Sequence, residues 1–166
     1  MAAAEPRLDS DDEQIPMTVK ERTVWASLVS VLVSSGVYFA LMVPRLLSQP
    51  VTEISWVRPL LWTMGLGVAG TVLLTVVLTV AAEANRNGGS SPASRDEVTS
   101  DVRDQEIGRL GWRASMSVIS VGSGAALVLT MLDAHTFWIG NLLFLVFTVG
   151  AVVEATTKLR LYRRGF

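Results

Sequence analysis

Three carboxylates stand close together in the second half of the chain, at Asp101, Asp104 and Glu106. Side chains of this type bind a divalent cation when several oxygens converge on one point, and they exchange protons when paired as acid and base. Arg103 and Arg109 lie at the spacing of ion pairs on a helix, which would neutralise these carboxylates. We therefore favour simple ion pairing and assign no catalytic or metal-binding role to Asp101 or Asp104.

Two further carboxylates and one amide are associated with long apolar stretches. Asn141 lies inside such a stretch, whereas Glu83 and Glu154 each stand at the end of one. An ionisable group within a membrane is a functional candidate by default. Both glutamates, however, have basic neighbours and a shallow position, which argues against a proton-coupled site. Asn141 is predicted to hydrogen-bond a neighbouring helix.

The sequence has few residues suited to other catalytic or metal-binding sites. It has no cysteine and one histidine, His135, so neither a disulfide framework nor a thiolate metal site is expected. There is no nucleophile–base–acid set and no Gly-rich phosphate loop. The sequence therefore predicts no enzyme activity, no cofactor and no nucleic-acid partner.

The elements that must position these residues are apolar. Half of the 166 residues are hydrophobic, 17% are charged, and the mean hydropathy is +0.43. Four stretches contain no ionisable side chain: 23–44, 59–82, 114–132 and 136–153. A membrane-spanning helix needs about 20 such residues. We predict an all-α integral membrane bundle of four transmembrane helices, with spans at about 23–44, 59–82, 114–132 and 136–155.

Basic residues predict how these spans are threaded. Twelve Lys and Arg residues lie in the N-terminal arm, the central loop 83–113 and the C-terminal tail, against two in the first hairpin loop and none in the Asp133–His135 turn. By the positive-inside rule both termini face the cytoplasm (N-in/C-in). The five tryptophans fall at the predicted span ends, where interfacial aromatic rings are common. The expected location is the cytoplasmic membrane, as a multi-pass protein whose outer loops are too short to fold.

The chain divides into an N-terminal arm and a membrane domain. Residues 1–22 form an acidic cytoplasmic arm that we expect to be disordered, and residues 23–166 form the membrane domain. Within the cytoplasmic loop 83–113, a Gly/Ser-rich linker precedes Ser94 and Glu97, which match a capping box. We therefore predict a short cytoplasmic helix before the third span.

A row of small residues with four-residue spacing marks the second span: Thr63, Gly67, Thr71, Thr75 and Thr79. Small residues at this spacing let helix backbones approach closely, and a Thr hydroxyl can bond to the carbonyl four residues earlier. We interpret the row as a packing seam. The alternative is a pore lined by hydroxyl groups.

The segment that starts at Asp101 also carries a family resemblance. It combines Asp101–Ile107 with a Gly- and Ser-containing span, the run Phe137–Ile139, Asn141 and the closing Leu161–Gly165. This pattern resembles a family of small prokaryotic membrane proteins known only as a domain of unknown function. Its members carry an Asp-Glu-Arg-Asp signature, from which this chain departs at Val102. The resemblance covers roughly residues 100–166; it implies a four-helix membrane protein and implies no activity.

These observations favour a protein that works through helix contacts. Its expected partners are the lipid bilayer and either a second copy of the chain or another membrane protein. The alternative is a small transporter or channel formed by homo-oligomerisation, although such proteins need a charged group at mid-bilayer. All four predicted spans are free of one.

Overall fold

The computed structural model is all-α, and the structure describes residues 19–86 and 96–164. Its elements are α1 (Val19–Ser48), a short 3₁₀ helix η1 (Val51–Glu53), α2 (Val57–Arg86), α3 (Asp96–Met131) and α4 (Thr136–Arg164). Each of the four α-helices is long and apolar enough to cross a membrane. The four predicted apolar spans are thus confirmed as helices, and the helices extend beyond them.

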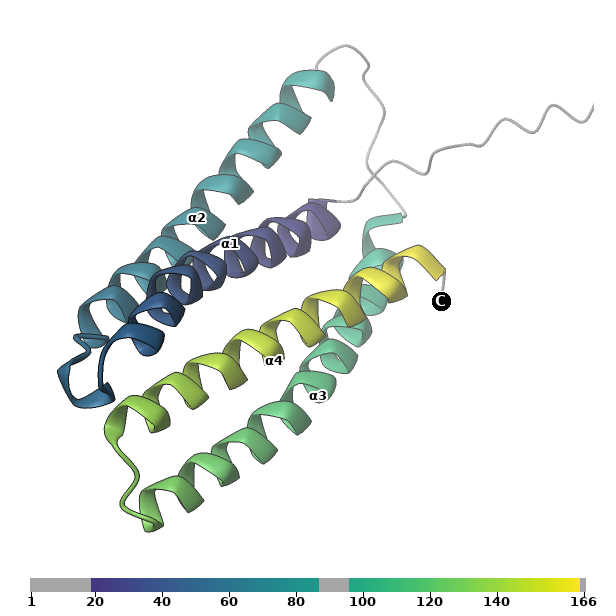
Figure 1. Ribbon diagram of the computed structural model, residues 1–166. Coiled ribbons are helices and arrows are strands. Elements are labelled where there is room, and N and C mark those ends of the chain that lie inside the picture. The colour runs from purple at the N-terminus through teal and green to yellow at the C-terminus, as the bar shows by residue number, and fades with distance from the viewer. Residues whose placement is uncertain (1–18, 87–95, 165–166) are drawn as a thin grey trace, which may run out of the picture.

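The four helices form an open row rather than a closed bundle. Extensive packing joins α1 to α2, α1 to α4 and α3 to α4, so the order across the row is α2, α1, α4, α3 (Figure 1). We call the end where α1 begins and α4 ends the terminal end, and the opposite end, with both tight connections, the hairpin end. Lipid supplies no hydrophobic force to close a row of apolar helices, so an open arrangement is physically consistent with a membrane.

Helices α1 and α2 approach each other through small residues. A Cβ atom built on Gly67 would lie 2.9 Å from Ser34 Oγ, and one built on Gly70 would lie 3.4 Å from the Ser30 Oγ. Thr63, which is 3% exposed, belongs to the same contact. Apart from Thr63, every residue of α2 with a described side chain is half-buried or exposed. This helix therefore offers most of its surface to lipid.

Helices α3 and α4 also pack through glycines. A Cβ on Gly122 would overlap the side chain of Val146, and one on Gly150 would lie 3.0 Å from Ile119. The turn between the helices has the Schellman form: Ala134 N donates to Leu129 O and Asp133 N to Thr130 O. Asp133 has a φ of 52°, in the left-handed region where a glycine is the usual residue.

Contact between α1 and α4 joins the two hairpins at both the hairpin end and the terminal end. At the hairpin end Tyr38 and Met42 form a buried cluster with Ile54 and Phe137. At the terminal end, Leu28, Ala155 and Leu159 form a second cluster, against which Trp25 packs.

The predicted short helix before the third span is the first part of α3, which runs unbroken from Asp96 to Met131. This stretch contains no proline, and it continues through Gly111, which lies against Lys158 of α4. Ser94 of the predicted capping box and residues 1–18 of the predicted arm lie outside the described residues. Residues 19–22, assigned to that arm, are the first turn of α1.

Candidate functional site

A hydrogen bond between two helices lies within the apolar part of the row. Tyr38 Oη on α1 donates to Asn141 Oδ1 on α4 over 2.7 Å, and Asn141 Nδ2 donates to Phe137 O over 2.8 Å. Tyr38 is fully buried. Asn141 is five residues into α4, or about 8 Å along its axis. Each polar group is therefore satisfied where lipid offers no hydrogen-bond partner.

Aromatic rings surround this polar pair. The Tyr38 ring meets Phe144 edge-on at a centroid separation of 4.8 Å and Phe39 at 5.5 Å. Trp56, in the first connection, packs edge-on against Phe137. Such pairs contribute roughly 0.5–1.5 kcal/mol beyond their buried area. The α1–α4 contact at the hairpin end is thus a shaped aromatic cluster around one hydrogen bond.

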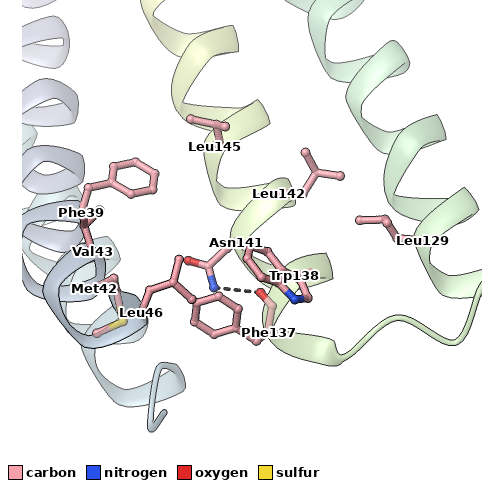
Figure 2. Close-up of a pocket in the computed structure, with 10 residues that line it drawn as sticks. All are labelled: Phe39, Met42, Val43, Leu46, Leu129, Phe137, Trp138, Asn141, Leu142 and Leu145. Atoms are coloured by element: carbon pink, nitrogen blue, oxygen red, sulfur yellow. Dashed lines mark hydrogen bonds between the residues drawn. The ribbon is translucent and has the colours of Figure 1, made fainter. Parts of the chain in front are cut away.

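An apolar groove opens beside the pair. It has a volume of about 410 Å³ and lies between α1 and α4, with Leu129 of α3 on its far side. Figure 2 shows Asn141 at its centre, between Phe39 and Val43 of α1 on one side and Trp138 and Leu142 on the other, with its amide directed to the Phe137 carbonyl. The lining is hydrocarbon apart from this amide, the Trp138 indole and the Met42 thioether. It supplies no group for acid–base chemistry.

The threonine row of α2 lies on its less exposed side. Thr63 is buried and Gly67 lies against Ser34 of α1, and Thr71, Thr75 and Thr79 are half-buried like Gly67. Three hydroxyls of the row donate to carbonyls four residues earlier: Thr63 to Pro59, Thr71 to Gly67 and Thr79 to Thr75. Those three hydroxyls are therefore satisfied within their own helix.

The candidate carboxylates do not converge. Glu154 forms an ion pair with Lys158 one turn later on α4. Asp104 accepts a hydrogen bond from Tyr162 of α4, close to Arg103 and Glu21. Glu106 is exposed. In the described parts of the chain, no three His, Asp or Glu side chains come together to hold a metal ion. The side chains of Glu83 and Asp101 lie outside what the structure describes.

The terminal end is instead a polar contact among three helices. Tyr162 and Lys158 of α4 reach α3 at Asp104 and Gly111. The Arg163 guanidinium lies 5.8 Å from the ring centre of Trp25 on α1, within cation–π range. Next to these residues, toward the hairpin end, Ser115 is 1% exposed and its Oγ has no hydrogen-bond partner. The contacts at the terminal end therefore join α1, α3 and α4.

Two residues with structural roles were not singled out by the sequence analysis. Tyr38 is the donor to Asn141, and its phenol in the middle of an apolar stretch was the available signal, since buried tyrosines usually find a partner. His135 accepts a hydrogen bond from Phe137 N through its Nδ1, which caps the start of α4. Its position just before an apolar run was the corresponding signal.

Comparison with known proteins found no matching family model, no similar curated protein and no matching solved structure. The resemblance based on Asp101–Asp104 therefore stays a prediction from sequence. What the residues establish directly is an all-α chain with four helices able to span a membrane.

Proposed function

We propose that this chain is a small multi-pass protein of the cytoplasmic membrane that works through helix contacts, as a homo-oligomer or as an accessory subunit of another membrane protein. Both termini face the cytoplasm in this proposal. The role requires no catalytic group and no cofactor. It uses the one property that all four helices share, an extensive apolar surface.

The observation that carries the proposal is the free face of α2. Helix α2 packs extensively on α1 alone. On its opposite side Gly65, Ala69, Val72 and Val76 are exposed. A Cβ built on Gly65 would meet nothing within 4 Å. Small residues four apart on an exposed face are the pattern by which membrane helices approach each other closely.

The absence of cysteine allows a direct test of self-association. In an Ala69→Cys variant, a second copy on the free face of α2 brings two thiols together, so oxidation in native membranes should give a disulfide-linked dimer. The matched control is Val121→Cys on α3, at a residue that is also apolar and is 76% exposed, on the edge of the row opposite α2. The control should remain a monomer.

A size measurement tests the same interface without cross-linking. Gly65→Leu should shift the native assembly to a smaller species, because the added side chain blocks close approach at the free face. Gly124→Leu on α3 is the matched control, since Gly124 also has nothing within 4 Å of a built Cβ. The proposal is wrong if the native protein is monomeric, purifies without a stoichiometric partner and gives no Ala69→Cys cross-link.

A further inference from the structure

We infer that Arg109 and Arg113 of α3 form a binding site for the headgroup of an anionic phospholipid. Both side chains are exposed, and they are four residues apart on one helix face. Gly111, midway between them, lies against Lys158 of α4. Two residues correspond to about 200° around a helix, so the Arg109–Arg113 face points directly away from α4.

The two guanidinium groups have no ion-pair partner among the described side chains. Two other basic residues at the terminal end are engaged: Lys158 pairs with Glu154, and Arg163 lies over Trp25. An unpaired arginine at a membrane surface is a strong phosphate donor, because its planar fork makes two hydrogen bonds at once.

Depth in the membrane favours a lipid over a soluble anion. Arg113 directly precedes the predicted start of the third span at Ala114, and Arg109 is four residues, or about 6 Å, further out. A headgroup layer is about 5–8 Å thick, so the pair brackets the level of lipid phosphate. Trp112, which is 54% exposed, stands at the same level, where indole rings prefer to lie.

The neighbouring residues on this face also fit a lipid. Toward the hairpin end Ser117, Ser120 and Gly124 are exposed, and a Cβ on Gly124 would meet nothing within 4 Å. An acyl chain can therefore lie directly along the helix below the headgroup. On the outer side Glu106 is exposed one turn beyond Arg109 and is therefore further from the phosphate.

The test is native mass spectrometry of the full-length protein in a non-ionic detergent, titrated with phosphatidylglycerol or with phosphatidylcholine of the same acyl chains. The protein should bind one phosphatidylglycerol at least about tenfold more tightly than the variant Arg109→Gln/Arg113→Gln does, because two basic contacts are lost. The matched control is Arg160→Gln, an exposed arginine on α4, which should stay within about twofold of the unmodified protein. Phosphatidylcholine should bind all variants alike.

A second variant separates lost charge from lost folding. Arg109→Lys/Arg113→Lys keeps both charges and should remain within about threefold of the unmodified protein for phosphatidylglycerol. Equal phosphatidylglycerol binding by the unmodified protein and the double Gln variant would overturn the site. So would an equal loss in Arg160→Gln or in the double Lys variant. Displacement of the lipid by inorganic phosphate would also overturn it, since the site would then take a soluble anion.

Discussion

Tyr38 and Asn141 are 103 residues apart in sequence, yet the Tyr38 hydroxyl donates a 2.7 Å hydrogen bond to the Asn141 side chain. The bond joins α1 to α4 and therefore the first helical hairpin to the second. It ties the two hairpins together within the aromatic cluster, where the rings of Phe39 and Phe144 pack against Tyr38.

Tyr38→Phe should lower the free energy of unfolding by about 0.6 kcal/mol and by no more than about 1.7 kcal/mol, the average and the maximum measured for hydrogen bonds between membrane helices. The loss arises because Asn141 keeps an amide oxygen without its donor. Unfolding in SDS, followed by circular dichroism, measures the change. Thr148→Val is the matched control, since its hydroxyl bonds only to Phe144 O on the same helix. An equal effect of the two changes would contradict a special role for the bond.

Replacement of Gly67 by Leu should destabilise the first hairpin by about 1–3 kcal/mol, the usual range for overpacking. The new side chain has no room beside Ser34, which lies 2.9 Å from the site of a Cβ atom. Gly65 lies two residues away, where a built Cβ meets nothing within 4 Å, so Gly65→Leu should leave the stability of the monomer unchanged. Thermal unfolding in detergent compares the stabilities of the two variants. A larger loss of stability in Gly65→Leu than in Gly67→Leu would refute the α1–α2 packing described above.

Ser115→Ala should leave stability within about 0.5 kcal/mol or raise it. The change removes a buried hydroxyl that has no partner, and an unpaired polar atom is itself unfavourable. Ser115→Leu should instead lower stability by about 1–3 kcal/mol, because Ser115 is buried and its backbone lies beside Gly150 of α4. A marked loss of stability in the Ala variant would contradict an unpaired Ser115 hydroxyl.

Asp133→Gly should stabilise the second hairpin by about 0.5 kcal/mol, because Asp133 has a positive φ that glycine adopts without steric strain. Asp133→Val should destabilise it by about 1–2 kcal/mol, since a β-branched residue is disfavoured there. Differential scanning fluorimetry of both variants shows whether each change raises or lowers the melting temperature. Equal melting temperatures would argue against the Schellman turn.

The existence and number of the helices were predictable from sequence, because a membrane-spanning helix reveals itself by length and hydropathy alone. The residues at which the helices begin and end were less predictable. Helix α1 begins at Val19 and passes through Pro44 to Ser48, although the apolar stretch covers only 23–44. Polar residues at a span end continue the helix into the headgroup layer, where no change of hydropathy marks the last turn.

The order of the helices in the row was not predictable, because apolar helices in lipid choose neighbours by shape rather than by hydropathy. Gly67 and Thr63 stand in the predicted seam and face α1, but the same pattern did not identify α1 as the partner. Asn141 was expected to bond a neighbouring helix. Its donor, Tyr38, became apparent only when α1 and α4 were seen side by side.

The central claim is that four helices cross the membrane and leave both termini on the cytoplasmic side. Single-cysteine labelling of intact cells tests it most directly, because the chain has no cysteine of its own. Thr52→Cys lies in the hairpin-end connection and Glu106→Cys on the exposed side of α3 toward the terminal end. A membrane-impermeant maleimide should label Thr52→Cys in intact cells, and Glu106→Cys only after the membrane is opened. Labelling of Glu106→Cys in intact cells, or of both variants alike, would contradict the account.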